Sequence, residues 1–183
     1  MDTQAATETE PMARLEVVRG RPDPFERLFL AEYGRVAAIA HRVLADAQEA
    51  EDVAQEVFID FHRRHPADAP FAAGWLHAAA AHTALNRIRG RKRRESREKR
   101  ALEVDTGALD PQRVFEESEQ RRQVRTALGR LPGRAAAVLV LRYGGLSYAE
   151  VAQAVGIRVG SVGTLLRRAE AALRKEVSGD TSG

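Results

Sequence analysis

The sequence predicts an all-helical protein made of two small helical domains joined by a charged flexible linker. Ala, Leu, Val, Arg and Glu are abundant in its 183 residues, and all but Val are good helix formers. No run of residues alternates β-branched with polar side chains between hairpin turns, so strand signals are nearly absent. The middle of the chain is too charged to be buried, which favours two domains over one large core.

Composition divides the chain into five segments. Residues 1–22 are expected to form a disordered tail, and they lack the apolar core of a signal peptide. A first helical domain is expected over 23–94 and a second over 116–177. Between them, 95–115 has no apolar periodicity and is basic at first and acidic after Leu102, as expected of a linker. Residues 178–183 are expected to be a flexible tail.

Composition also argues against several classes of function. The net charge is +3, from 29 basic and 26 acidic residues, and the charges are segregated into blocks. Blocks of like charge are typical of proteins with charged partners. There is no Cys, and the five His show no ligand motif, so we expect no metal, cofactor or thiol chemistry. No apolar run approaches the length that spans a membrane, and we expect a cytoplasmic protein without membrane insertion.

An acidic helix is predicted near the middle of the first domain. Asp46 with Glu49 resembles a capping box that opens this helix. An apolar stripe follows at helical spacing: Ala50, Val53, Ala54, Val57 and Phe61. Acidic side chains share a flank of the same helix: Glu49, Asp52, Glu56 and Asp60. The flank is interpreted either as a solvated face or as a docking surface for a basic partner.

A basic helix is predicted to end the first domain. It begins near Trp75 as an Ala-rich apolar segment. From Arg87 to Arg100 it carries nine Lys or Arg and two Glu. This stretch is either a soluble charged linker or a surface that contacts phosphates, which Arg and Lys neutralise.

The C-terminal region predicts two short helices joined by a turn. Pro132 begins a helix that Gly144 and Gly145 end. Ser147, with Glu150 three residues on, is typical of a capping box. Gly156 ends that helix in a left-handed conformation, and a second helix is expected to start near 160–161.

This second helix is predicted to be amphipathic. The side chains expected to face the core are Val162, Leu166, Ala169 and Leu173. Those expected to face outward are Gly163, Thr164, Arg167, Arg168 and Ala171. The pattern indicates a helix-turn-helix whose second helix enters a DNA major groove. An ordinary helical hairpin in a bundle is the alternative.

Two stretches carry a resemblance to a known family. GLSYAEVAQAVGIRVGSVGTLLRRAEAALR resembles the fourth domain of extracytoplasmic-function sigma factors of the sigma-70 family. FERLFLAEYGRVAAIAHRVLADAQEAEDVAQEVFIDFHRR resembles their second domain. The likeness covers about 24–94 and 116–177, in the family's order and spacing. It implies a non-catalytic subunit of RNA polymerase that reads promoters and starts transcription.

The resemblance also implies three sets of binding residues. Core polymerase, through the coiled coil of its largest subunit, would be bound by Glu49, Asp52, Gln55, Glu56 and Asp60. The −10 promoter element and its melted strand would be bound by Phe71, Trp75, His82, Asn86, Arg87, Arg89, Arg91, Arg93 and Arg94. The −35 element would be bound by Ser147, Tyr148, Arg158, Ser161, Thr164, Arg167 and Arg168. The helix-turn-helix would also touch the polymerase flap, and the linker, acidic over 103–119, would thread the polymerase cleft.

This sequence departs from the family pattern at three positions. His82 stands where members often have Asn, in the stretch that helps to hold a flipped −10 base. Gly163 and Leu165 stand where basic residues are usual. We therefore expect weak or unusual −35 readout, or greater dependence on the arginines of the reading helix. The loop 66–73 is expected to set −10 specificity.

Other functions remain open from the sequence. An enzyme is disfavoured because no nucleotide-binding Gly loop or ligand motif is present. A free-standing helix-turn-helix regulator would bind duplex DNA alone, usually as a dimer. A degenerate family member would bind polymerase without supporting initiation. Family analogy adds an anti-sigma factor as a partner, on surfaces left open between the two domains.

Overall fold

The computed structural model describes residues 23–102 and 119–179, and this part of the chain contains seven helices and no strand. The helices are α1 (Pro24–Leu44), α2 (Ala47–Arg64), α3 (Ala72–Leu102), α4 (Glu119–Arg130), α5 (Gly133–Tyr143), α6 (Tyr148–Val155) and α7 (Val159–Gly179). The predicted all-helical class is confirmed. The tail expected at 1–22 lies outside the described residues, as do residues 180–183 of the tail expected at 178–183, whereas residues 178–179 form the end of α7.

Side-chain caps fix where the first two helices begin. The carboxylate of Asp23 accepts a hydrogen bond from the backbone N–H of Phe25 at 3.2 Å, and Pro24 occupies the first turn of α1. The carboxylate of Asp46 accepts from the N–H of Glu49 at 2.8 Å. These caps satisfy amide groups that have no partner within the helix. The start of α2 at Asp46 is therefore as the sequence predicts.

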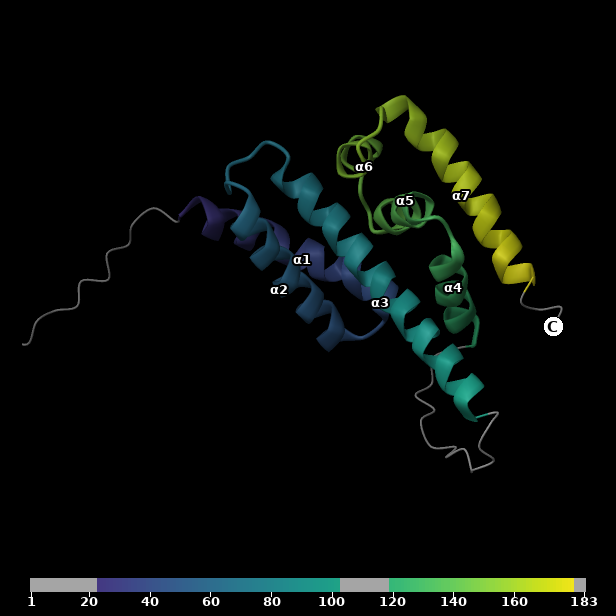
Figure 1. The fold of residues 1–183 in the computed structure, drawn as a ribbon. Helices are drawn as coiled ribbons and strands as arrows, with labels where there is room; N and C mark the ends of the chain where they lie inside the picture. Colours follow the sequence, from purple (N-terminus) through teal and green to yellow (C-terminus); the bar gives the residue numbers. More distant parts are fainter. Residues whose placement is uncertain (1–22, 103–118, 180–183) are drawn as a thin grey trace, which may run out of the picture.

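The N-terminal half is a three-helix unit in which α1 and α2 pack against α3 and against each other (Figure 1). The apolar stripe predicted for α2 faces this core. Its largest fully buried side chains are Ile39 of α1, Phe58 and Phe61 of α2, and Leu76 and Leu85 of α3. Phe58 also meets the rings of Phe25 and Phe29 edge to face. One apolar cluster thus fixes the angles among the three helices.

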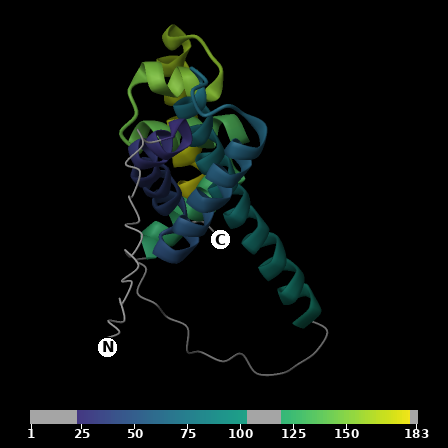
Figure 2. The same cartoon turned by 90° about the vertical axis from the view of Figure 1, so that its left-hand side faces the viewer.

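Helix α3 continues past residue 94, where the sequence analysis places the end of the first domain. It is helical to Leu102, and Figure 2 shows its C-terminal part extending beyond the other helices. Residues 95–102 are Arg, Lys, Glu, Ala, Leu and a single Ser, most of which favour helix without needing a core. The linker predicted to begin at 95 is therefore helical in its first part. The remainder, together with residues 116–118 of the predicted second domain, lies outside the described residues.

The C-terminal half is built around α5. Residues 136–141 of this helix are all buried, as expected of a helix surrounded by others. Helices α3, α6 and α7 pack against it, while α4 packs against α3 and α7, and α6 also contacts α3 (Figure 1). The buried side chains of the two halves form one continuous apolar cluster. The two predicted domains therefore pack directly on each other through this cluster.

The core assignment predicts that truncating Phe58 destabilises the protein strongly. Phe58→Ala should lower the free energy of unfolding by about 3–5 kcal/mol, because it removes a buried ring and leaves a cavity. Leu30→Ala is the matched control, since Leu30 is 71% exposed on α1, and it should change stability by less than about 0.5 kcal/mol. Urea unfolding followed by circular dichroism measures both. Equal effects of the two changes would contradict the core assignment.

Candidate protein and nucleic-acid interfaces

The acidic face of α2 is divided between paired and exposed side chains. Glu49 forms an ion pair with Arg91 at 3.1 Å, and Glu56 forms one with Arg87 at 3.0 Å, both across to α3. Asp60 pairs with Arg64 on its own helix at 2.9 Å. The first three turns of α2 contain no Lys or Arg that could pair with the acidic flank. Helix α3 supplies two such partners, Arg87 and Arg91.

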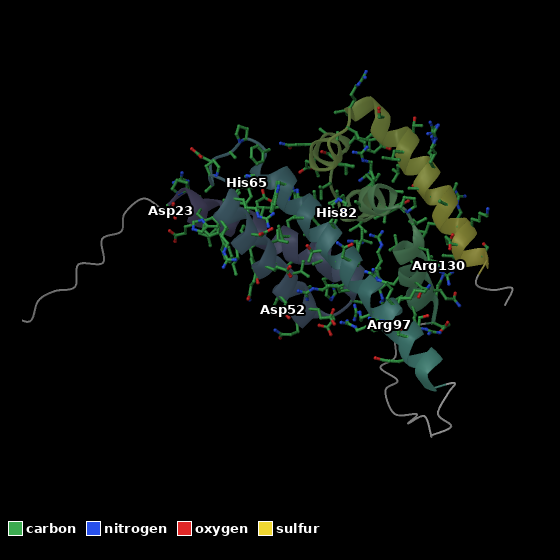
Figure 3. The ribbon with its side chains drawn as sticks, in the orientation of Figure 1. Asp23, Asp52, His65, His82, Arg97 and Arg130 are labelled. Carbon is green, nitrogen blue, oxygen red and sulfur yellow. The ribbon has the colours of Figure 1, made fainter. Side chains whose placement is uncertain are left out.

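The exposed part of this face combines acidic, polar and apolar groups. Asp52 and Gln55 are exposed, and Asp52 lies on the outer side of α2 (Figure 3). Ile59, one turn further on, is 51% exposed. A hollow on this face is lined by Asp52, Gln55, Glu56, Ile59, Asp60, Arg63 and Arg64. An exposed aliphatic side chain bordered by carboxylates suits a partner that presents apolar and basic groups.

The basic residues of α3 point to two sides. Arg87, Arg91 and Arg94 border the hollow that also contains Glu49 and Glu56 of α2. Arg89 lies on the other side, toward the C-terminal half. Its Nε donates to the backbone oxygen of Gly129 at 3.0 Å and its Nη2 to that of Leu131 at 2.9 Å.

An arginine-rich cavity of about 870 Å³ lies between α3 and α4. Its lining includes Arg89, Arg91, Lys92, Arg93, Arg122, Arg125 and Arg130, and the acids that the described residues contribute are Glu95 and Glu119. Partial burial, and secondarily the charge of Arg91, lower the pKa of Arg125. Crowded cations of this kind are stabilised by an anion such as a phosphate group.

The predicted −10 residues near the start of α3 form an aromatic cluster. The ring of His65 lies 5.3 Å from that of Phe71, edge to face, and 5.3 Å from that of Trp75. Trp75 also packs on Phe61 at 5.4 Å and is only partly accessible. Phe71 is 45% exposed. Trp75 therefore packs within the cluster, while the ring of Phe71 is the more exposed of the two.

His82 is exposed on α3, one turn before Asn86 (Figure 3). Its pKa is lowered, first by partial desolvation of the ring and second by the positive charge of Arg89. The imidazole is therefore neutral at pH 7 and can stack on a base or hydrogen-bond to it without adding charge. Asn86 is also exposed, and its Oδ1 accepts a 3.4 Å hydrogen bond from Arg89.

The predicted helix-turn-helix is present in α6 and α7. The hydroxyl of Ser147 accepts from the N–H of Glu150 at 3.3 Å, and a carboxylate oxygen of Glu150 accepts from the N–H of Ser147 at 2.7 Å. Gly156 ends α6 with φ of 69°, a left-handed conformation that Gly adopts without a steric penalty. The second helix starts at Val159, next to the predicted 160–161.

The outward face of α7 carries the side chains that the sequence assigned to it. Val162, Leu166 and Ala169 are buried, whereas Leu173 is only partly buried. The predicted −35 residues all lie exposed: Ser147, Tyr148, Arg158, Ser161, Thr164, Arg167 and Arg168. Tyr148 has the guanidinium of Arg142 above its ring at 5.6 Å. A Cβ at Gly163 would make ordinary contact with that ring at 3.6 Å, so alanine fits there.

Several contacts between the halves have no counterpart in the sequence analysis. Arg35 of α1 pairs with Glu150 of α6 at 2.7 Å. The amide of Gln153 donates to the backbone oxygen of Pro70 at 3.1 Å. Arg35 and Glu150 lie 115 residues apart in the chain, so no local pattern indicates that they meet.

Glu150 generates a prediction about acid stability. Hydrogen bonds from the Ser147 backbone and hydroxyl, and then from Arg35, lower the pKa of Glu150 to about 2. A carboxylate with a lowered pKa stabilises the fold above its unfolded pKa of about 4.3 and loses that effect as the pH falls toward 2. The stability difference between the wild type and Glu150→Gln should therefore narrow from pH 5 to pH 2.5 in urea unfolding.

Arg35→Gln serves as the graded comparison for this measurement. It removes only the hydrogen bond and charge of Arg35, which lower the pKa of Glu150 less than Ser147 does, so the acid dependence should change less than with Glu150→Gln. A difference between the wild type and Glu150→Gln that stays constant over this pH range would contradict the assigned hydrogen bonds.

Comparison with known proteins matches both halves to family models. Residues 28–94 match the model of sigma-70 region 2, and residues 121–173 match that of sigma-70, region 4. No helix in the described residues is long and apolar enough to cross a membrane.

Individual relatives give the same result. The chain is 32% identical to the RNA polymerase sigma-H factor of Pseudomonas aeruginosa, with 87% of this chain and 89% of that protein covered. It is 27% identical to the ECF RNA polymerase sigma factor SigW of Bacillus subtilis, with 88% and 93% covered. CnrH, solved in complex with the cytosolic domain of CnrY, shares the fold with a TM-score of 0.50 at 23% identity, over 85% of this chain and 88% of that chain. The chain therefore belongs to the sigma-70 family of RNA polymerase sigma factors, in its extracytoplasmic-function group.

Proposed function

We propose that this chain binds core RNA polymerase through α2 and directs it to promoters, with α3 at the −10 element and α7 at the −35 element. The observation that carries the proposal is the presence, in one chain, of an exposed acidic helix face and a separate helix-turn-helix with an exposed basic face. A regulator that binds DNA alone would not need the exposed acidic face. The chain itself would catalyse nothing, and it would act in the cytoplasm, on the nucleoid.

The exposed part of α2 supports the polymerase contact. Asp52 and Gln55 face solvent beside Ile59, so a partner would bury one aliphatic side chain and meet a carboxylate. Glu49, Glu56 and Asp60 were assigned to the same surface, and in the free chain each is paired with an arginine. Polymerase would therefore have to compete for those three carboxylates, which makes Asp52 and Gln55 the primary contacts.

The first part of α3 supports contact with the −10 element as a melted strand. Phe71 offers an exposed ring, and His82 a neutral imidazole, on which an unpaired base can stack. Asn86 can hydrogen-bond a base edge. Arg87, Arg91, Arg93 and Arg94 then follow along α3 as groups that neutralise phosphates.

The exposed face of α7 supports contact with duplex DNA at the −35 element. Thr164, Arg167 and Arg168 lie on the side of the helix opposite its buried residues. A helix of this width with basic and polar residues outward fits a major groove. An anti-sigma factor is a further partner that we propose, because it would need only to cover these same exposed faces.

The polymerase contact predicts the effect of reversing one charge. Asp52→Lys should weaken binding of core RNA polymerase at least ~10-fold, because loss of one partner from a buried, hydrogen-bonded charge pair at an interface costs about 2–5 kcal/mol. The matched control is Glu51→Lys, an exposed neighbour on the same helix that lies outside the proposed set, and it should bind nearly as the wild type does. Pull-down of core polymerase at moderate salt measures all three proteins.

Both variants should unfold at the wild-type urea concentration, because exposed helix charges contribute little to stability. Equal binding by Asp52→Lys and the wild type would refute the docking surface. A wild-type chain that binds duplex DNA tightly without polymerase, and binds no polymerase, would instead establish a free-standing regulator.

The −35 contact predicts a change in salt dependence. Arg167→Gln should lower the affinity of the holoenzyme for promoter DNA and reduce the slope of log K against log salt by roughly one, the value for one lost phosphate contact. Lys175→Gln, an exposed cation near the end of α7, is the control and should leave the slope unchanged. Fluorescence anisotropy over a salt series measures the slopes, and identical slopes would contradict the proposed role of Arg167.

A further inference from the structure

The arginine-rich cavity between α3 and α4 has the size of a small-molecule site. Its volume is about 870 Å³, within the roughly 300–1,000 Å³ of pockets that hold such ligands. The two helices lie side by side (Figure 1). They touch at one end of the cavity, where a Cβ added at Gly129 would lie 3.6 Å from Cδ1 of Ile88. Arg89 fixes that end, since its guanidinium donates to the backbone oxygen of Gly129 at 3.0 Å.

Positive charge exceeds negative charge around this cavity. Among the described residues, seven basic and two acidic side chains line it. Ion pairs compensate part of the charge, and they are Arg122–Glu119 at 2.8 Å, Arg91–Glu49 at 3.1 Å and Arg130–Glu176 at 3.6 Å. Glu49 and Glu176 lie outside the lining, and counting them gives four carboxylates against the seven cations in the described part of the chain. A surplus of cations therefore surrounds a space large enough for a ligand.

The α4 wall of the cavity offers groups that suit an anion. Arg125 is partly buried there. Desolvation by this burial, and secondarily the charge of Arg91, lower the pKa of Arg125. Both effects disfavour the charged guanidinium, whereas an anion bound beside it would favour that form. Gln123 and Thr126 also line this wall, and their amide and hydroxyl groups can donate hydrogen bonds to anionic oxygens.

The number and type of these cations favour an anion that carries several phosphates close together. A guanidinium binds two oxygens of one phosphate at once, so cations on two facing helices can engage more than one phosphate. Successive phosphates of an oligophosphate share a bridging oxygen, which places several negative charges within one cavity. A nucleic-acid strand carries only one phosphate per nucleotide, so its charges are spread along a surface instead.

We propose that the cavity between α3 and α4 is a binding site for an oligophosphate with at least three phosphates, supplied by a nucleoside triphosphate or by inorganic polyphosphate. Arg91, Lys92 and Arg93 bind it from α3, and Arg122 and Arg125 bind it from α4. The site goes beyond the proposed function, because binding needs neither polymerase nor a promoter.

Calorimetric titration of the full chain with inorganic tripolyphosphate tests the site. In magnesium-free buffer at moderate salt, we expect saturable binding of one molecule per chain. Orthophosphate should bind at least ~30-fold more weakly, because it offers one phosphate and so engages fewer of the charge-assisted hydrogen bonds. Equal affinity for orthophosphate and tripolyphosphate would overturn the proposal.

A pair of substitutions on α4 separates the site from general electrostatic attraction. Arg125→Gln should weaken tripolyphosphate binding at least ~10-fold, because it removes hydrogen bonds to a charged ligand. Arg121→Gln is the matched control, since it removes the same charge from an exposed position of the same helix outside the lining, and it should change the affinity less than ~2-fold. Equal losses in the two variants would overturn the proposal.

A variant of the opposite wall keeps the test independent of how Arg125→Gln folds. Lys92 lines the cavity from an exposed position on α3 and lies outside the residues assigned to DNA or polymerase. Lys92→Gln should weaken tripolyphosphate binding ~3-fold or more, because the site loses one of its cations. Urea unfolding followed by circular dichroism checks that each variant is folded. An unchanged affinity in folded Lys92→Gln would count against a site shared by the two helices.

Titration with ATP identifies the source of the oligophosphate. Equal affinity for ATP and tripolyphosphate would support a site that recognises the phosphate chain alone, as in inorganic polyphosphate. An affinity for ATP at least ~10-fold higher would support a nucleoside triphosphate, with further contacts to the nucleoside.

Two other results would overturn the oligophosphate site. One is the absence of saturable tripolyphosphate binding up to about 1 mM. The other is binding of a single-stranded oligonucleotide, weakened by Arg125→Gln, by a chain that does not bind tripolyphosphate, which would assign the cavity to a nucleic acid. Because these titrations contain no polymerase, their failure leaves the proposed polymerase contact through α2 standing.

Discussion

The packing of alanines along α3 is the constraint on which the rest of the structure depends. Ala80, Ala81 and Ala84 have no exposed surface, and each lacks a side chain long enough to hold a neighbouring helix away. Helices can approach closely over such residues and bury large side chains beside them. As a result, one helix is the common wall of both halves, with α1 and α2 on one side and α4, α5 and α6 on the other. The positions of every candidate binding face are set relative to this helix.

Charge on α3 is distributed so that each side of the helix meets a different partner. Arg87 and Arg91 reach carboxylates of α2, whereas Arg89 reaches backbone oxygens of the C-terminal half. Exposed ion pairs add little stability, so these contacts are easily exchanged for phosphate groups. In the free chain these arginines therefore join α3 to both of its neighbours through contacts that are individually weak.

Glu150 illustrates how one side chain joins local structure to tertiary structure. Its carboxylate completes the cap of α6 with Ser147 and also binds Arg35 of α1. The cap fixes the orientation of the helix-turn-helix, and the ion pair fixes where that motif sits on the N-terminal half. Replacing Arg35 removes only the second role and leaves the cap of α6 in place.

Local patterns in the sequence determined a large part of this protein. The caps at Asp46 and Ser147, the left-handed Gly156 and the buried stripes of α2 and α7 follow from residues a few positions apart, because helix geometry repeats over one or two turns. For the same reason the exposed faces of α2 and α7 could be assigned in advance. The end of α3 could not be assigned from the sequence. Its charged residues beyond 94 resemble a linker, although good helix formers can remain helical without a buried face.

Only the tertiary structure decided which of these side chains have a partner within the free chain. The partners of Glu49, Glu56 and Arg89, and the contact between Gln153 and Pro70, join positions 31 to 83 residues apart. No periodicity links such positions, since their meeting depends on how apolar faces pack and bring whole helices together. The sequence by itself therefore determined the family, the helices and their polar faces. The packing of the two halves on α3 decided that Arg89 and Pro70 of the predicted −10 region have partners in the C-terminal half, because α4, α5 and α6 rest on the same helix.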